Sequence, residues 1–535
     1  MRGFAVSPEF NPSRRTGRLP RRTSRGRAAF RRRAGPPRAR AAWRIQVSEM
    51  RSRILAALVA VAVAGCTVGP DYARPVTDAP AAWRIDYPKA AEVANTKWWE
   101  QFGDPVLNEL IETALRENRD VRIAAARVDQ FIGALTATRS QLYPQIGYGA
   151  DASRVRRSRE GVPPIPPPGD PYFTLYQASL GASWQLDLFG RVQRLSEAAQ
   201  AQVYASEQGQ RGVVLSVVTG VASSYIFLRA LDRQLEIAQA TAKNFGETKR
   251  IFDLRFKAGI VSQTEVAQVA SQYQQALAAI PAIAQQVAAQ ENLISVLLGR
   301  DPGPVPRGKS IDELVPPLIP ADLPSALLQR RPDILQAEQN LVAANANIGA
   351  ARALYYPTIS LTGLLGSAST AFGNFLSGPA STWALAAGVA GPVFTFGAIE
   401  GQVKSAEAQE RVALAFYQQT ILVAFRETND ALTGSQKKIE EAAMQQLRVQ
   451  ALRDFARLSR LKFDKGVASY LDVLVAENEL FAAELASVRV LAERYTQLVS
   501  VYQAMGGGWV DIANSVNPRP EGLAAAAPAA SGSPR

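Results

Sequence analysis

The chain contains an internal repeat, and this repeat constrains its fold more than any other feature of the sequence. Residues 250–266 align without gaps with residues 457–473, and both carry the pattern Phe-x-x-Gly-x-x-Ser at a constant offset of 207 positions. A similar match, at an offset of 213, relates Leu142-Tyr143-Pro144 to Tyr355-Tyr356-Pro357. A long repeat indicates one structural unit built twice. Each half should therefore show the same order of helices and strands.

In each half a helical pattern ends at a Tyr-Pro pair, because the residue before a proline disfavours the helical conformation. These patterns cover residues 104–138 and 324–353. After the first pair, residues 145–153 and 172–188 alternate between apolar and polar side chains, which predicts strands with one apolar and one polar face. The charged, Pro-rich residues 154–171 between them are expected to form an exposed hairpin loop.

The matching region of the second half, residues 354–399, carries no charged side chain. A transmembrane helix is therefore the alternative to a second hairpin. Seven glycines and three prolines interrupt this stretch, and both residues disfavour one continuous helix. We predict strands over residues 357–369 and 382–396.

Four strands are too few to close an outer-membrane barrel, which needs at least about eight. Open sheet edges are not tolerated in hydrocarbon, so the strands should be pooled between chains. Two copies would give eight strands and three copies twelve. An eight-stranded barrel is filled by its own side chains, whereas a larger one can conduct. The small and polar side chains on one strand face favour the larger barrel, and the predicted fold is an α+β membrane channel.

After each hairpin a long helical pattern is followed by a reversal and a return helix. The long patterns cover residues 191–257 and 400–465, which would span on the order of 100 Å at about 1.5 Å per residue. The return helices are expected over residues 264–298 and 471–505, and Pro281 should kink the first of them. Apolar residues recur every three or four positions, as in coiled-coil packing.

The chain lacks the groups that most hydrolytic and metal sites need. It has no histidine and one cysteine, which excludes a histidine base, a Ser-His-Asp relay and Cys- or His-based zinc sites. Carboxylate chemistry is not excluded, but no carboxylate pair stands apart from ordinary solvated helix faces. We predict that the protein is not an enzyme and that it has no metal site and no cofactor.

An apparent export signal precedes the only cysteine. Met50 is followed by Arg51, Arg53 and the apolar residues 54–65. This pattern is typical of a signal peptide, and it is too short for a membrane span, which needs about 20 residues. The sequence around Cys66, Val-Ala-Gly-Cys, resembles the bacterial lipobox. This resemblance implies lipid on the cysteine, and a Thr rather than an Asp at the next position points to the outer membrane. The alternative is an ordinary signal peptide with a chance cysteine.

The basic charge of the chain belongs to its first residues. Residues 1–49 hold fourteen arginines against two glutamates, and we interpret them as a mis-annotated extension upstream of a start at Met50. A nucleic-acid-binding arm is the alternative. Without residues 1–65 the net charge is −1, with 44 basic and 45 acidic side chains. No nucleic-acid partner is therefore expected for the remaining body.

With these features the sequence resembles the outer-membrane factors, which are the TolC-like channel subunits of tripartite export systems. Within this family it resembles the lipoprotein branch of OprM/NodT type. The resemblance spans Cys66 to about Trp509. It rests on four motifs besides the doubled Phe-x-x-Gly-x-x-Ser: Gly69-Pro70-Asp71-Tyr72-Ala73-Arg74-Pro75, Trp98-Trp99-x-x-Phe102-x-Asp104-Pro105, Leu186-Asp187-Leu188-Phe189-Gly190-Arg191 and Ala424-Phe425-Arg426-Glu427.

The family resemblance implies a homotrimer with a twelve-stranded barrel in the outer membrane and a helical tunnel through the periplasm. It also implies docking to a periplasmic membrane fusion (adaptor) protein and an inner-membrane RND pump, with passive conduction of the exported substrate. The alternatives are a TolC-like channel of type I protein secretion and a coiled-coil structural lipoprotein of the periplasm.

The resemblance also suggests two sets of site residues. The helix reversals would contact the adaptor through Gly259, Ile260, Ser262, Gly466, Val467 and Ser469. Here glycine serves the turn, and the two serines are candidate helix N-caps. Asp430, with Arg426 four residues before it, would form a ring of carboxylates at a periplasmic gate. The alternative for this pair is an exposed i,i+4 interaction.

The expected organisation of the chain follows from these features. It comprises an upstream extension (1–49), a lipoprotein signal peptide (50–65), a first repeat (66–299) with a hairpin over 143–189, a Pro-rich linker (300–324), a second repeat (325–509) with a hairpin over 356–396, and a disordered tail (510–535).

Overall fold

A computed structural model describes residues 67–76, 97–319 and 324–507. The predicted extension, signal peptide, lipidated Cys66 and C-terminal tail lie outside the described residues. The main elements in chain order are η1 (Trp98–Phe102), α2 (Pro105–Glu117), α3 (Arg119–Ser140), β1 (Gln145–Arg156), β2 (Tyr172–Leu186), α4 (Arg191–Lys257), α5 (Gln263–Leu297), α6 (Pro324–Arg330), α7 (Pro332–Arg352), β3 (Thr358–Ser369), β4 (Ser381–Ala390), α8 (Ala398–Asp464) and α9 (Tyr470–Ala504).

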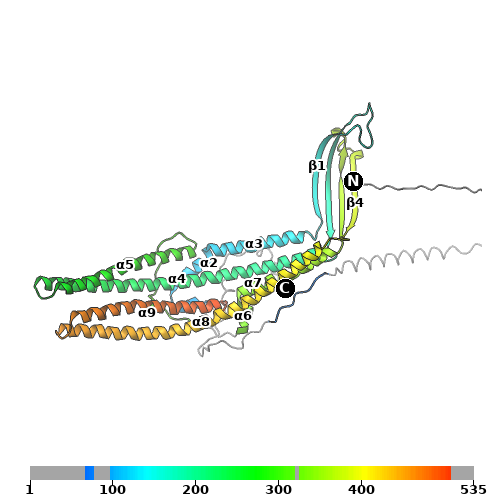
Figure 1. Cartoon of the computed structure of the whole chain (residues 1–535). Helices are drawn as coiled ribbons and strands as arrows, with labels where there is room; N and C mark the ends of the chain where they lie inside the picture. Colours follow the sequence, from blue (N-terminus) through cyan, green and yellow to red (C-terminus); the bar gives the residue numbers. More distant parts are fainter. Residues whose placement is uncertain (1–66, 77–96, 320–323, 508–535) are drawn as a thin grey trace, which may run out of the picture. The chain divides into compact units, whose positions relative to one another are not determined.

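The two halves repeat one plan, as the sequence predicts. The order α3-β1-β2-α4-α5 returns as α7-β3-β4-α8-α9 (Figure 1). The long helices α4 and α8 have 67 residues each, and the return helices α5 and α9 have 35 each. Pro281 lies inside α5, which continues past it, so its kink stays a prediction. Helix α4 is long and apolar enough to cross a membrane, but 67% of that apolar window is buried inside the protein.

The four strands form one antiparallel sheet in the order β1-β2-β3-β4. A transmembrane helix over residues 354–399 is therefore ruled out. The structure corrects two strand ends, because β1 continues to Arg156 and β4 ends at Ala390 rather than at residue 396. Gly391 and Pro392 follow β4 directly, and a proline cannot donate a hydrogen bond to the ladder.

Each helical pattern that leads to a hairpin is broken once, which the sequence analysis does not predict, although Pro332 marks the second break. The first break lies at Asn118, where Oδ1 accepts a hydrogen bond from Val121 N–H (3.0 Å) and Nδ2 donates to Leu297 O at the end of α5 (2.8 Å). The second break lies at Arg331, whose Nη1 donates to Ala504 O at the end of α9 (3.0 Å). These partners are related by the same offsets of 213 and 207 as the motifs. Each half therefore joins the end of its return helix to the start of the helix that leads to the sheet.

The Pro-rich segment between the halves is part of the core rather than only a linker. Its apolar side chains Val305, Ile311 and Leu314 are buried against α2, α4 and α9. The fully buried carboxylate of Asp104 fixes this packing, because it accepts hydrogen bonds from Tyr225 Oη (2.8 Å), Lys309 N–H (3.0 Å) and Val106 N–H (2.9 Å). Burial, and secondarily the neighbouring carboxylate, raises the pKa of Tyr225.

We expect Asn118→Ala to lower the free energy of unfolding by about 1–2 kcal/mol. The substitution removes the cap of α3 and leaves Leu297 O without its side-chain partner. The loss should appear as a lower midpoint of thermal unfolding, followed by the helical circular dichroism signal. Thr138→Ala is the control, since it removes one exposed bond to Ala134 O within α3 and should leave the midpoint nearly unchanged. Equal midpoints for the two variants would contradict the assigned role of Asn118.

Candidate functional site

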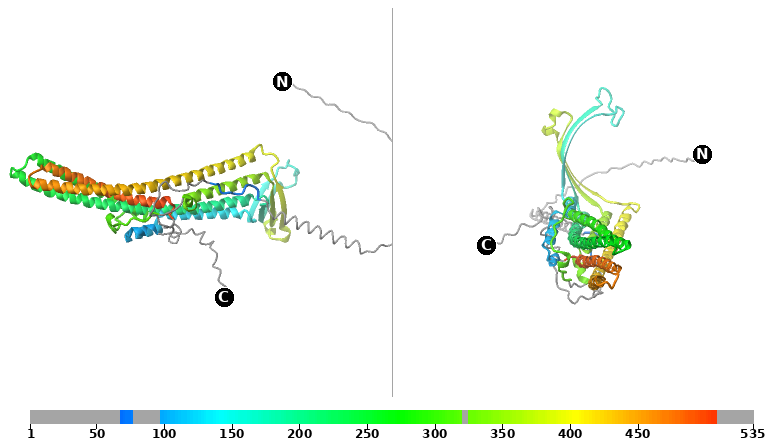
Figure 2. Two further views of the ribbon diagram at one scale, coloured as in Figure 1. Left: turned by 90° about the horizontal axis from the view of Figure 1, so that it is seen from below. Right: turned by 90° about the vertical axis from the view of Figure 1, so that its left-hand side faces the viewer.

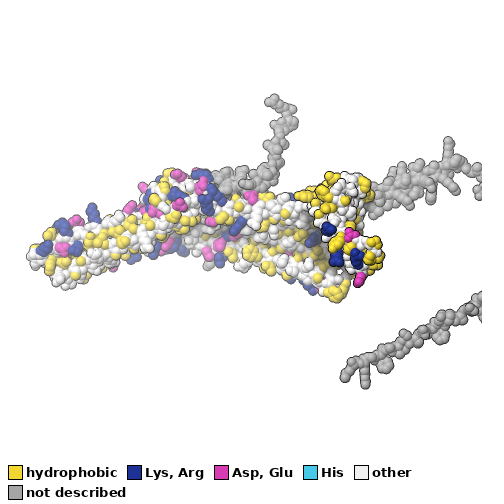
Figure 3. All heavy atoms as spheres, turned by 90° about the horizontal axis from the view of Figure 1, so that it is seen from above, with side chains coloured by type: hydrophobic (Ala, Val, Ile, Leu, Met, Phe, Trp, Pro, Cys, Tyr) yellow, Lys and Arg dark blue, Asp and Glu magenta, His cyan; other side chains and the backbone are white. Residues whose placement is uncertain are grey.

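The strand register separates two chemically different faces of the sheet. Even positions of β1 and β2 lie on the same side as odd positions of β3 and β4. We call this side the apolar face; its exposed large side chains are Ile146, Tyr148, Tyr172, Leu180, Trp184, Leu361, Leu365, Trp383, Leu385 and Val389. Trp184 and Leu186 of β2 therefore lie on the same side of the sheet as Trp383 and Leu385 of β4. Hydrophobic side chains gather over this end of the chain in Figure 3, and Figure 2 shows the curvature of the strands.

The opposite side of the sheet is polar and hollow. Its positions are mostly Gln, Ser, Thr, Gly and Ala, and it borders a hollow of about 710 Å³. The residues on this polar face that line the hollow include Gln145, Ser179, Ser183, Thr362 and Ala386. A sheet with one exposed apolar face and one polar face that borders a hollow is suited to separate lipid from water.

The two helix reversals have the backbone that the sequence predicts. Gly259 and Gly466 adopt φ values of +72° and +74°, and an added Cβ would meet no atom within 4 Å. Replacing either glycine by another residue would therefore strain the backbone, although there is space for the added side chain. Beside them, Ile260 and Val467 are 70% and 74% exposed, which agrees with the expected exposure.

The two candidate N-caps differ. Ser262 forms a capping box with Glu265, in which Ser262 Oγ accepts from Glu265 N–H (3.3 Å) and the Glu265 carboxylate accepts from Ser262 N–H (2.7 Å). Ser469 occupies the N-cap position of α9, but its side chain makes no capping bond. The position equivalent to Glu265 holds Asp472, which is one methylene shorter. The predicted N-cap position of Ser469 is therefore confirmed, but the side-chain hydrogen bond of a cap is absent there.

The two reversals belong to one packed end of the helical region. Phe252 of α4 contacts Tyr470 of α9, with ring centroids 4.3 Å apart, and Phe463 of α8 lies 4.9 Å from Tyr470. The Arg255 guanidinium covers both Phe252 and Phe463 at 5.8 and 5.7 Å. Burial raises the pKa of Glu477 on the neighbouring turns of α9, and Arg460 offsets this only partly.

Asp430 and Arg426 do lie on one face of α8, but they interact weakly. Arg426 Nε and Asp430 Oδ2 are 4.0 Å apart, and the two side chains are 65% and 75% exposed. Asp430 lies 34 residues before the end of α8, about 50 Å from the reversal at about 1.5 Å per residue. The predicted gate residue is therefore at mid-helix, and its gating role stays a prediction.

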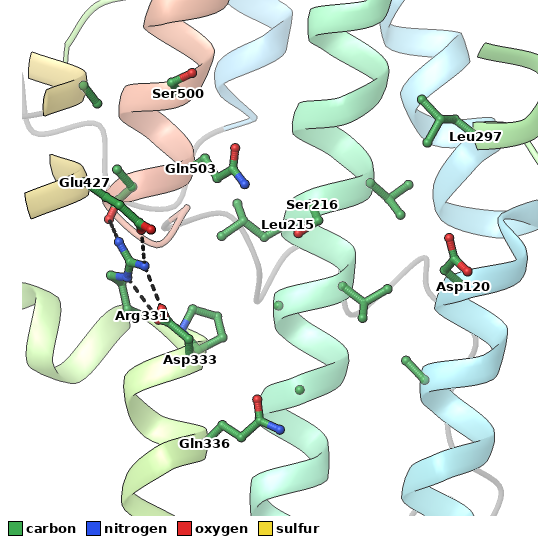
Figure 4. Close-up of a pocket in the computed structure, with 18 of the residues that line it drawn as sticks. Asp120, Leu215, Ser216, Leu297, Arg331, Asp333, Gln336, Glu427, Ser500 and Gln503 are labelled. Carbon is green, nitrogen blue, oxygen red and sulfur yellow. Dashed lines mark hydrogen bonds and ion pairs between the residues drawn. The ribbon is translucent and has the colours of Figure 1, made fainter. Parts of the chain in front are cut away.

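Asp430 borders a hollow of about 1000 Å³ between α3, α4, α7, α8, α9 and the end of α5. Three further carboxylates line it, from Asp120, Asp333 and Glu427. Figure 4 shows Arg331 between Asp333 and Glu427, which accept its Nη2 hydrogen bonds at 2.6 and 2.8 Å.

Burial alone would lower the pKa of Arg331, but its bonds to the two carboxylates outweigh burial and raise it. Arg331 therefore stays charged and neutralises part of the acidic lining, whereas Asp430 has only the weak contact with Arg426 described above. Sequence reasoning missed Arg331. The available signal was its offset of 213 from Asn118.

Within the described ranges, no group of three or more His, Cys, Asp or Glu side chains is placed to hold a metal ion.

Comparison with known proteins gives a consistent result. A family model described as outer membrane efflux protein matches residues 110–300 and 323–507. The chain is 33% identical over 479 residues to TtgC of Pseudomonas putida, a probable efflux pump outer membrane protein, with 87% of this chain and 98% of the relative covered. It is 31% identical over 467 residues to the cation efflux system protein CusC of Escherichia coli, with 85% and 99% covered.

A solved structure supports the same relationship. The open state of the MtrE outer membrane channel of Neisseria gonorrhoeae superimposes with a TM-score of 0.75 at 29% identity, and the match covers 83% of this chain and 99% of that one.

Proposed function

The chain belongs to the outer membrane efflux protein family, and from this premise we propose that three copies assemble into one outer-membrane channel. The sheet carries the proposal. The outer edges of β1 and β4 have no strand partner within the described chain, and unpaired backbone groups are too costly in hydrocarbon. Three copies supply twelve strands, which leave room for a wet lumen lined by the polar face.

We further propose that the channel passively passes substrate received from a periplasmic adaptor and an inner-membrane RND pump. The relatives named as efflux proteins support this role over type I protein secretion. A purely structural lipoprotein would have no use for a sheet with an exposed apolar face. Membership of the outer membrane efflux protein family supports the role of a conduit for this chain.

The test is the oligomeric state and conductance of the full-length protein extracted in detergent. Light scattering should give three chains per particle, and planar bilayers should show discrete ion-conducting steps. A monodisperse monomer that retains its β-sheet circular dichroism signal would contradict the proposal, because its sheet edges would then be stable without partners.

Lipid on Cys66 would anchor the chain beside this barrel. Val68 N–H donates to Phe189 O (3.3 Å), between the end of β2 and the start of α4. The first described residues after Cys66 are thus held where the sheet meets the helices, which is the level of a membrane surface in this proposal. Acyl chains contribute about 0.8 kcal/mol per buried CH₂. Mass spectrometry of the mature N-terminus should find Cys66 acylated rather than as a free thiol.

The reversal end is proposed to dock the adaptor through the exposed Ile260 and Val467. The double variant Ile260→Asp/Val467→Asp should abolish export, because it places two charges in an apolar contact, and should leave the trimer intact. Dye efflux from cells that carry the complete system measures this. Val162→Asp is the matched control, since Val162 is fully exposed in the β1–β2 loop. Undiminished efflux by the double variant would remove the docking proposal.

Asp430 is proposed to add a ring of three carboxylates to the conduit. A ring of like charges attracts cations to relieve its repulsion. Asp430→Ala should therefore raise single-channel conductance and weaken block by divalent cations in planar bilayers. Asp454→Ala removes an exposed carboxylate farther along α8 that pairs with Arg457, and it should change neither property. If the two variants behave alike, Asp430 is an ordinary exposed residue.

A further inference from the structure

Two arginines end the apolar face of the sheet on the side away from the helices. Arg154 and Arg156 occupy even positions of β1, opposite Thr174 and Tyr172 of β2. They therefore belong to the apolar face and not to the polar one. The Arg154 guanidinium lies 5.5 Å from the centroid of the Tyr172 ring, which fits a cation–π contact.

The spacing along β2 gives the height of these arginines in a membrane. Trp184 marks the helix-side border, where its ring N–H donates to Leu142 O (2.9 Å). Tyr172 lies twelve positions earlier, a distance of roughly 40 Å along the strand and about 31 Å along the membrane normal at a tilt of about 40°. The apolar band of such barrels is about 25 Å tall. Tyr172 and the arginines beside it therefore lie just outside the hydrocarbon, at the level of lipid headgroups.

In the parts of the chain that the structure describes, no carboxylate forms an ion pair with these two guanidinium groups. Among the described residues neither Arg154 nor Arg156 takes part in an ion pair, and both are exposed. In the following loop, the carboxylate of Asp170 accepts a hydrogen bond from Tyr172 N–H (2.9 Å). Figure 3 shows Lys and Arg side chains at the sheet end beside hydrophobic ones, with a few Asp and Glu side chains among them. By contrast, the β3–β4 loop carries no charge.

We propose that Arg154 and Arg156 form a site for the phosphate groups of an anionic glycolipid in the outer leaflet. The proposal rests on the membrane placement of the sheet given above. A guanidinium fork matches phosphate oxygens in a bidentate manner. The apolar face below the arginines, which extends through Tyr176 to Tyr148 and Leu180, would contact the acyl chains of the same lipid. A soluble phosphate would use only the first of these contacts, which favours the lipid as occupant.

The experiment measures binding of bis-phosphorylated lipid A to the full-length trimer in detergent, by titration in native mass spectrometry. Basic side chains near an anionic membrane surface strengthen binding roughly fivefold each. The double variant Arg154→Gln/Arg156→Gln should therefore bind roughly 30-fold more weakly. Dephosphorylated lipid A should bind the wild type about as weakly as lipid A binds the variant, and inorganic phosphate at millimolar concentration should not displace the lipid.

The control variant Arg119→Gln/Arg448→Gln removes the same charge from exposed positions of α3 and α8 and should bind lipid A like the wild type. Conductance of every sample is recorded in parallel, so that failure of the channel proposal is distinguished from failure of this one. Equal lipid A binding by the Arg154/Arg156 variant and the wild type, equal binding of dephosphorylated lipid, or full displacement by inorganic phosphate would each overturn the proposed site.

Discussion

Backbone hydrogen bonding at the two free edges of the sheet governs the rest of the architecture. In hydrocarbon each unsatisfied N–H or C=O group costs several kcal/mol, so the sheet must close with other copies. The closed sheet also determines how the helices are arranged, because α3, α4, α7 and α8 each connect directly to a strand. Their side-by-side order follows the strand order, with α3 against α4, α4 against α7 and α7 against α8. A closed sheet therefore requires a closed ring of helices beneath it.

The sequence predicts the elements well because their causes are local. The alternation of β2, the Tyr-Pro pairs and the glycines with positive φ each act within a few residues, and the repeat checks each assignment against a second copy. The boundaries of α4 are confirmed without change, and those of α5, α8 and α9 shift by one or two residues. The capping of α5 by Ser262 is also confirmed, since a Ser followed by Glu at the third position is a local signal.

The features that sequence reasoning missed depend on partners far along the chain. Asn118 bonds to a residue 179 positions away, and Arg331 to one 173 positions away. A helical pattern read in a short window runs through both breaks. Ser469 occupies the predicted N-cap position but makes no capping bond, because the residue three positions later is Asp472 where the first repeat has Glu265. The acidic hollow beside Asp430 likewise combines residues of six helices, and no single segment contains its signal.

The equal lengths of the two long helix pairs, α4 with α5 and α8 with α9, restrict how such a chain can change by insertion and deletion. Phe252 and Tyr470 meet only because α4 with α5 and α8 with α9 are matched in length. Removal of seven residues from both helices of one pair, for example α4 and α5, would shift the reversal between them by about 10 Å along the helix axis. The Phe252 and Tyr470 rings would then be separated. The same removal from both helix pairs would keep the two rings in contact. Related chains should therefore gain or lose helical turns in both halves at once. An insertion or deletion in one repeat should be matched by one of equal length in the other.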